Sequence, residues 1–308
     1  VFILFIIHLK KLMNKPNLII VGAAKSGTTS LHHYLDQHDE IFMSKHKEPH
    51  FLINNEAGVN EIPNGINNYE DYLRLFENTK SYKYRGESSV MYLQFPELTI
   101  KNIAQYLDEN IKIIIMLRNP IDRAFSGYQH VKRYNKMENY TFKEAIEKSE
   151  KRYFENKKIT PASRYLNIGL YYNFVKKFKS KFKNNVHIII YDDFVNKTHH
   201  ELSLLFDFLE LEKNIIDLKK KHMVGGWQWK NESVKNIFMS KSILKSTLKI
   251  ILPFKSIRKK IRNYFMFLAI SPVEKIDLET RKKLLNFYID DIEKLEALIN
   301  KDLSIWKQ

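Results

Sequence analysis

The sequence feature that most constrains the fold is the stretch from Asn17 to Leu35, NLIIVGAAKSGTTSLHHYL. Its apolar, partly β-branched start is typical of a buried strand, Gly22 interrupts the strand, and a helical spacing of apolar residues begins at Thr28. Glycine lets the backbone approach an anion closely, and a helix N-terminus offers unpaired N–H groups and the positive end of its dipole. The stretch therefore predicts a strand, a phosphate-binding loop and a helix.

This loop differs from the ordinary nucleotide-binding P-loop. That loop has the form G-x-x-x-x-G-K-[ST], with its lysine directly after the second glycine. Here the spacing of the two glycines fits, but Lys25 lies inside the loop and Thr28 takes the usual place of the lysine. We interpret the stretch as a phosphate-binding loop of a different family.

Further along the chain, apolar strands alternate with helical patterns. Strands are expected at 40–44, 111–117 and 186–191, and helices from 69, from 121, and at 141–158, 171–182 and 277–300. This alternation predicts an α/β fold with a doubly wound central parallel sheet flanked by helices. Residues 1–12 carry an apolar run before basic residues, the wrong order for a secretory signal, and we expect them to be a non-native or disordered extension.

The charge of the chain points to anionic partners. It has 51 Lys+Arg against 35 Asp+Glu, a formal net charge of +16. Such a surface attracts nucleic acid, anionic lipid, acidic glycans or nucleotides, so a basic nucleic-acid or anionic-surface binding protein is one alternative. The basic segment from Lys235 to Arg262 has apolar residues between its charges, as a membrane-surface helix does, although Pro253 interrupts it. The absence of cysteine excludes disulfides and Cys-ligated metal sites.

Two motifs together resemble the signatures of the PAPS-dependent sulfotransferases: AKSGTTSL at 24–31 and RNPIDRAFSGY at 118–128. KHKEPHF at 45–51 and GESS at 86–89 resemble further motifs of the carbohydrate O-/N-sulfotransferase branch, which includes the heparan sulfate enzymes. DLSIW at 302–306 is similar to the ending of bacterial members. The resemblance implies a P-loop-like sulfotransferase fold in a single domain over 13–308.

The resemblance also implies an activity. A sulfuryl group would pass from PAPS (3′-phosphoadenosine 5′-phosphosulfate) to a hydroxyl or amine of a glycan or glycolipid, with release of PAP and without a metal. Because this donor is anionic at two ends, two binding devices are expected. The first is Ala24, Lys25, Ser26, Gly27, Thr28, Thr29 and Ser30, and the second is Arg118 with Ser126. Lys25 is the expected catalytic cation, because charge grows on the bridging oxygen as the S–O bond breaks.

The acceptor must lose a proton as it attacks sulfur, so a general base is expected nearby. The resemblance assigns this role to Glu48, with His46 and His50 as alternatives. Glu87 either contacts the acceptor or supports the loop through a buried ion pair.

The resemblance further places a lid over the donor at about 219–235. Gly225, Gly226 and Lys230 would contact the 3′-phosphate end of the donor, and Trp227 would either stack on adenine or a sugar or merely pack.

A P-loop kinase of small metabolites is the competing enzyme. Its Walker B strand ends in Asp to hold Mg²⁺, whereas the strand at 111–117 is followed by Arg118, which repels a metal. The sulfotransferase is the favoured interpretation of the sequence. For such an enzyme no nucleic-acid partner is expected. The expected location is the cytoplasm, with peripheral contact at the inner membrane face left open.

Overall fold

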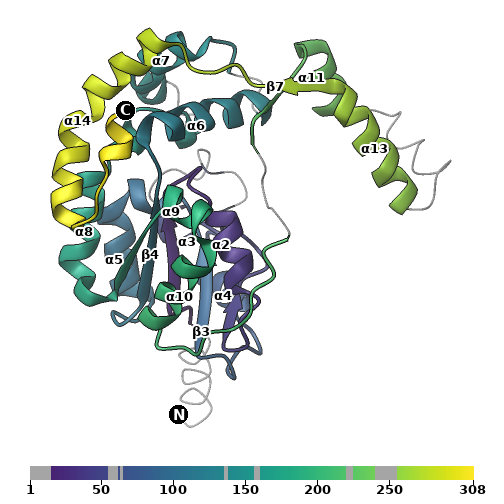
Figure 1. The fold of residues 1–308 in the computed structure, drawn as a ribbon. Coiled ribbons are helices and arrows are strands. Elements are labelled where there is room, and N and C mark those ends of the chain that lie inside the picture. The colour runs from purple at the N-terminus through teal and green to yellow at the C-terminus, as the bar shows by residue number, and fades with distance from the viewer. Residues whose placement is uncertain are drawn as a thin grey trace.

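The computed structural model describes residues 15–54, 62, 65–134, 138–155, 160–219, 225–239 and 255–308. The predicted extension at 1–12, residues 220–224 of the predicted lid, and Pro253 lie outside the described residues. The described residues form a layered body from which two helices, α11 (Glu232–Met239) and α13 (Lys255–Ala269), project as an arm (Figure 1).

The centre of the body is a five-stranded parallel sheet in the order β2-β3-β1-β4-β5. The strands are β1 (Leu18–Gly22), β2 (Ile41–Met43), β3 (Tyr84–Ser88), β4 (Lys112–Leu117) and β5 (Val186–Ile190). Strand β1 lies in the middle, where Ile19 is in register with Glu87 of β3 and Ile113 of β4. The structure confirms the predicted parallel sheet and the four strands that apolar patterns indicated.

Helices cover both faces of the sheet, as the doubly wound prediction requires. One face carries α5 (Pro96–Tyr106), α6 (Pro120–Tyr134), α8 (Tyr171–Phe182) and α14 (Leu278–Ile299). The other carries α2 (Thr28–Leu35), α9 (Tyr191–Asn196) and α10 (Thr198–Phe208). Because side chains alternate along a strand, Ile19 and Val21 of β1 pack on the first layer, and Leu18 and Ile20 pack on the second.

Shorter elements complete the described fold. They are α3 (Phe51–Asn54), α4 (Tyr69–Arg74), α7 (Phe142–Glu155), the antiparallel pair β6 (Trp227–Trp229) and β7 (Ile270–Pro272), and the 3₁₀ turns η1 (Tyr92–Gln94), η2 (Pro161–Ser163), η3 (Asn167–Gly169), η4 (Lys183–Asn185) and η5 (Ser304–Lys307). Helix α6 begins where the sequence predicts it, because the Asn119 side chain accepts the N–H of Ile121 at 2.9 Å and Pro120 suits the first helical position.

Strand β3 is an element that the sequence patterns did not indicate, because Arg85, Gly86 and Glu87 interrupt any apolar run. Tertiary contacts stabilise it. A Cβ atom at Gly86 would lie 2.3 Å from the sulfur of Met43, so glycine at this position leaves room for the Met43 side chain. The fully buried Glu87 carboxylate accepts hydrogen bonds from the Tyr72 and Ser89 hydroxyls.

The strand order creates a crevice at the carboxyl edge of the sheet. Strands β3 and β2 lie on one side of β1, and β4 and β5 lie on the other. Loops that leave β1 and β4 therefore diverge, and open α/β sheets bind their ligands at such a switch point. The loop at 23–27 and Arg118 both lie there, directly after β1 and β4.

The end of β1 admits only glycine. Gly22 has φ +148°, and a Cβ atom there would lie 2.8 Å from the Val90 carbonyl oxygen and 2.9 Å from Cβ of Leu93. We expect Gly22→Ala to lower the free energy of unfolding by about 1–3 kcal/mol, measured by urea denaturation. Gly225→Ala is the control, since nothing lies within 4 Å of its added Cβ. Equal denaturation midpoints for the two variants would contradict this account.

Candidate functional site

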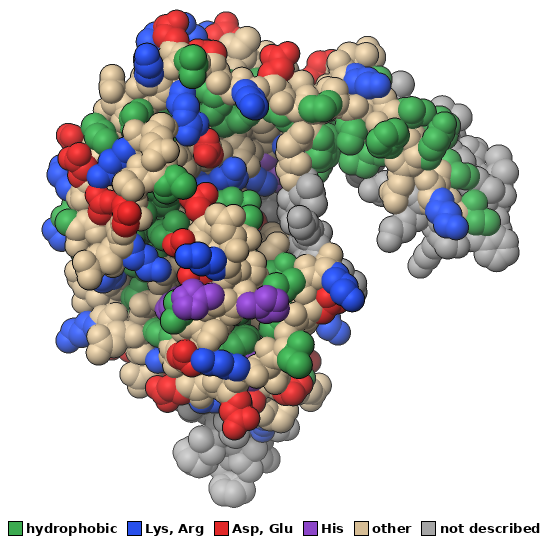
Figure 2. Space-filling view, viewed as in Figure 1, with side chains coloured by type: hydrophobic (Ala, Val, Ile, Leu, Met, Phe, Trp, Pro, Cys, Tyr) green, Lys and Arg blue, Asp and Glu red, His purple; other side chains and the backbone are tan. Residues whose placement is uncertain are grey.

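A cavity of about 1020 Å³ opens at the carboxyl edge of the sheet. Figure 2 shows the surface hollowed between the body and the arm, with Lys and Arg side chains at the hollow. The predicted site residues that line it are Ala24, Lys25, Gly27, Thr28, Thr29, Ser30, Glu48, His50, Arg118, Ser126, Gly225 and Gly226. Those that lie outside its lining are Ser26, His46, Glu87, Trp227 and Lys230. The structure thus brings most of the predicted residues together from segments far apart in the sequence.

The loop after β1 presents the N-terminus of α2 to the cavity. Gly27 is the N-cap residue of this helix in a left-handed conformation, and no side chain of the described residues caps it. The N–H groups of the first helical turn, at Thr28 and Thr29, therefore keep the capacity to bind an anion. Ser26 is fully buried beneath the loop, so it contributes to the shape of the loop rather than to the cavity wall.

Lys25 is a half-buried cation in this loop. Its Nζ lies 3.4 Å from Nδ1 of His130 on α6. Burial lowers the pKa of Lys25 to about 8, the charges of Arg133 and Arg118 act in the same direction, and only Glu48 opposes them. An anion in the cavity would stabilise the charged form of Lys25 and raise its pKa again.

Arg118 lies directly beside the loop. Its guanidinium donates a hydrogen bond to the carbonyl oxygen of Lys25 at 3.2 Å and packs over the Tyr191 ring at 4.7 Å from the ring centroid. The backbone of Arg118 is held too, because the Tyr171 hydroxyl donates to its carbonyl oxygen at 3.0 Å. Ser126, two turns into α6, lines the same cavity. A cation and a hydroxyl therefore converge next to the loop, as the sequence predicted.

Two of the cavity residues that the sequence analysis missed follow Ser126 on α6. His130 and Arg133 follow Ser126 at spacings of four and seven residues on α6, so all three share one helix face. The spacing from Ser126 is the sequence feature that could have identified His130 and Arg133 as cavity residues. Burial, then the charges of Lys25 and Arg133, lower the pKa of His130 to about 4, so this ring is neutral at pH 7.

Glu48 and His50 come from the loop after β2, and both have positive φ values, 64° and 51°. The Glu48 carboxylate accepts a hydrogen bond from Lys47 Nζ at 2.7 Å and lies 3.4 Å from Nε2 of His50. Burial raises the pKa of Glu48, but the hydrogen bond from His50 and the charge of Lys47 outweigh burial and lower it to about 2. Glu48 is therefore ionised at neutral pH, whereas His46 is exposed away from the cavity lining.

Glu87 supports this loop from behind. Its carboxylate accepts hydrogen bonds from the Ser89 hydroxyl at 2.7 Å and the Tyr72 hydroxyl at 3.2 Å, and Ser89 Oγ accepts the N–H of His50 at 3.0 Å. Burial raises the pKa of Glu87 to about 7. Of the two interpretations that the sequence left open, the geometry favours support of the loop, but through hydrogen bonds from the Ser89 and Tyr72 hydroxyls rather than through the expected ion pair.

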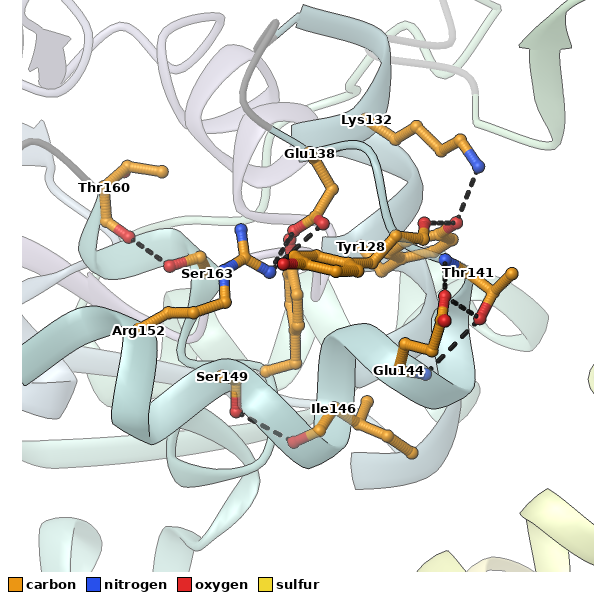
Figure 3. Close-up of polar contacts among 12 residues, drawn as sticks. Tyr128, Lys132, Glu138, Thr141, Glu144, Ile146, Ser149, Arg152, Thr160 and Ser163 are labelled. Carbon is orange, nitrogen blue, oxygen red and sulfur yellow. Dashed lines mark hydrogen bonds and ion pairs between the residues drawn. The ribbon is translucent and has the colours of Figure 1, made fainter. Parts of the chain in front are cut away.

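A second buried carboxylate, that of Glu138, lies in the polar cluster of Figure 3. Glu138 is 1% exposed, accepts from Arg152 of α7 at 3.2 Å and accepts from the Tyr165 hydroxyl at 2.5 Å. The neighbouring turn is closed by Ser163, whose hydroxyl donates to the carbonyl oxygen of Thr160 at 2.7 Å. Thr160 itself lines the cavity, so this polar cluster borders the cavity wall.

The described part of the predicted lid, 225–235, lies at the mouth of the cavity. Gly225 and Gly226 line it, while the Trp227 ring packs under the Arg133 guanidinium at 4.8 Å. Lys230 is exposed outside the lining, and its N–H donates to the carbonyl oxygen of Ala269 at 3.0 Å. Strand β6 thus attaches the base of the arm to α6.

Among the residues that the structure describes, no group of three or more His, Cys, Asp or Glu side chains could hold a metal ion. In the same part of the chain, no helix is both long enough and apolar enough to cross a bilayer.

Comparison with known proteins gives consistent matches. The family model described as "Sulfotransferase domain" matches residues 15–276. The chain is 33% identical over 118 residues to the membrane-associated sulfotransferase kil1 of Dictyostelium discoideum, covering 38% of this chain and 23% of that protein. It is 33% identical over 133 residues to the bifunctional heparan sulfate N-deacetylase/N-sulfotransferase 1 of Xenopus laevis, covering 42% of this chain and 15% of that protein. The chain thus spans less than a quarter of the length of either relative.

A solved structure matches over nearly the whole chain. The crystal structure of a sulfotransferase from Alicyclobacillus acidocaldarius is 28% identical, with a TM-score of 0.71 over 96% of this chain and 99% of that one. The fold is therefore the P-loop-like fold of this family.

The support of the Glu48 loop by Glu87 can be tested. We expect Glu87→Ala to lower the free energy of unfolding by about 1–3 kcal/mol, because the buried hydroxyls of Ser89 and Tyr72 lose their acceptor. Urea denaturation at pH 7 measures this change. The control is Glu77→Ala, an exposed position, with an expected change within about 0.5 kcal/mol. A Glu87→Ala protein as stable as this control would show that the buried hydrogen bonds do not hold the loop.

Proposed function

The chain belongs to the sulfotransferase family, and we propose that it moves a sulfuryl group from PAPS to a hydroxyl or amine of a glycan or glycolipid and releases PAP. The observation that carries this proposal is the convergence of the 24–30 loop, Arg118 and Ser126 on one cavity at the switch point of the sheet. A donor with an anionic group at each end needs two neighbouring anion-binding sites, here the 24–30 loop and the pair of Arg118 and Ser126.

The chemistry of the cavity fits this donor. The first turn of α2 and the hydroxyls of Thr28 and Thr29 suit a 5′-phosphate, which binds at helix N-termini through backbone N–H groups. Arg118 and Ser126 suit a 3′-phosphate, because a guanidinium binds phosphate oxygens through two parallel hydrogen bonds. An arginine at the end of β4, where a kinase would place an aspartate for Mg²⁺, argues against the competing kinase.

In the proposed reaction the acceptor oxygen or nitrogen attacks sulfur, and the S–O bond to the 5′-phosphate breaks. Lys25 stabilises the negative charge that grows on the bridging oxygen. Glu48 accepts the proton of the acceptor, for which its ionised state is required. His50, 3.4 Å from Glu48, orients that carboxylate and is the next candidate for the base.

The proposal of a lid at 219–235 is supported by the position of Gly225 and Gly226, which line the cavity together with the proposed donor-binding residues. Trp227 and Lys230 would act from outside the lining as the lid closes. We treat residues 13–308 as the single domain that carries the reaction. The cytoplasmic location stays a prediction from the sequence.

The acceptor is proposed to bind on the α6 side of the cavity. Arg133 lies there, stacked on Trp227, and Thr160 lines the same cavity. A cation beside an aromatic ring suits a sugar that carries an acidic group, because the ring packs against the sugar face and the guanidinium binds its oxygens.

Donor binding is the first test. We expect PAP to bind in EDTA by calorimetric titration, and Arg118→Ala to weaken binding by about 10- to 100-fold, because hydrogen bonds to a charged group are worth about 1.5–3 kcal/mol. Arg74→Ala removes an exposed arginine far from the lining and is the matched control, with unchanged affinity. If PAP fails to bind while ATP binds once Mg²⁺ is restored, the kinase interpretation replaces this one.

Turnover separates the catalytic roles. With radiolabelled PAPS and a panel of glycans and glycolipids, we expect Lys25→Ala to abolish transfer and Glu48→Ala to lower kcat by about 10²- to 10⁴-fold. Both variants should still bind PAP through Arg118. Glu40→Ala, an exposed position before β2, is the control. Near-normal turnover of Glu48→Ala would remove Glu48 from the role of base and assign it to His50.

A further inference from the structure

The described surface has an unusual concentration of exposed apolar side chains on α13. Of the thirteen large apolar side chains that are exposed in the described residues, five lie on this one helix of 15 residues. They are Ile257 (43% exposed), Tyr264 (63%), Phe265 (56%), Phe267 (73%) and Leu268 (46%). Figure 2 shows hydrophobic side chains gathered along the projecting arm. Scattered apolar residues are normal on a protein surface, but a cluster of this kind marks an interaction site.

Four of these side chains form a stripe together with Ile261, and Phe267 lies off it. Ile257, Ile261, Tyr264, Phe265 and Leu268 follow one another at spacings of four, three, one and three residues, so they share one face of the helix. Ile261 is half-buried and the others are exposed. Helix α13 projects from the body (Figure 1), and the exposed fractions of Ile257, Tyr264, Phe265 and Leu268 show that these side chains are not packed in the core.

The charge of the helix identifies the partner. The sequence of α13, KSIRKKIRNYFMFLA, has five Lys and Arg residues and no Asp or Glu. A second copy of this chain, placed against the stripe, would bring the same cations together and would be repelled. An anionic lipid surface is instead complementary to both features, since it accepts apolar side chains at the acyl boundary and attracts Lys and Arg at the headgroups.

The length of α13 fits a helix that lies in the membrane surface. Fifteen residues extend only ~22 Å, less than the ~30 Å of a bilayer core. We propose that α13 is a membrane-surface helix that docks this protein on anionic lipid bilayers through the stripe at 257–268.

Docking of α13 would place the cavity beside the membrane. The helix continues directly into β7, which pairs with β6, and Gly226 and Val273 at this hairpin line the cavity. The inference about docking does not rest on the proposed reaction, because it uses only the arm.

Vesicle co-sedimentation of the full chain, without donor or acceptor, tests the proposal. We expect the chain to bind vesicles of phosphatidylcholine in which about one lipid in three is phosphatidylglycerol, and to bind little to phosphatidylcholine alone. Binding to the anionic vesicles should weaken in about 0.5 M NaCl, because salt screens the charges. Phe265→Asp/Leu268→Asp should lower the partition coefficient by about tenfold or more, because it removes two inserted side chains and adds two negative charges.

The matched control is Phe154→Asp/Ile305→Asp, which makes the same charge change at two exposed apolar positions of the body, 71% and 55% exposed. Its binding should stay within about twofold of the unmodified chain. PAP titration of each variant checks that the body is folded. Equal loss of binding in both variants would reduce the effect to net charge and overturn the proposal. Failure of the unmodified chain to bind anionic vesicles would also overturn it, as would a dimer lost only in Phe265→Asp/Leu268→Asp.

Discussion

Collecting several cations in one partly buried cavity costs free energy, through loss of hydration and through mutual repulsion, and this constraint governs the site. The cost is reflected in the pKa of Lys25, which burial and the charges of Arg133 and Arg118 lower to about 8. Two carboxylates line the same cavity: Glu48, bound to Lys47, and Asp122, bound to Arg281 at 2.9 Å. The remaining positive charge is best neutralised by an anionic ligand, which is why a doubly anionic donor fits.

The scaffold holds this arrangement through buried carboxylates that never reach the cavity. Glu87 fixes the Glu48 loop through Ser89, and Glu138 holds Arg152 of α7 and Tyr165, which follows the turn at 160–163. A side chain held in this way does not have to be ordered when the ligand binds. Such preorganisation makes a binding or catalytic group effective, because the cost of ordering it is met during folding.

The body and the arm differ in how much of their apolar surface is exposed. The body buries its apolar residues on both faces of the sheet, whereas α13 exposes a stripe of them. The β6–β7 hairpin joins the two, and its ends line the cavity. Any partner that covers the stripe therefore lies next to the side of the cavity where the acceptor is proposed to bind.

The sequence by itself determined the parallel α/β sheet, the loop at 24–30 and the place of Arg118, because apolar period, glycine spacing and strand ends are local properties of the chain. The sequence patterns missed β3, since Gly86 and Glu87 are explained only by Met43 and by the hydroxyls packed around them. Only the tertiary structure decided that His130 and Arg133 face Lys25 while His46 and Lys230 lie outside the lining. Burial and charge coupling depend on which segments meet, and that is a property of packing rather than of spacing along the chain.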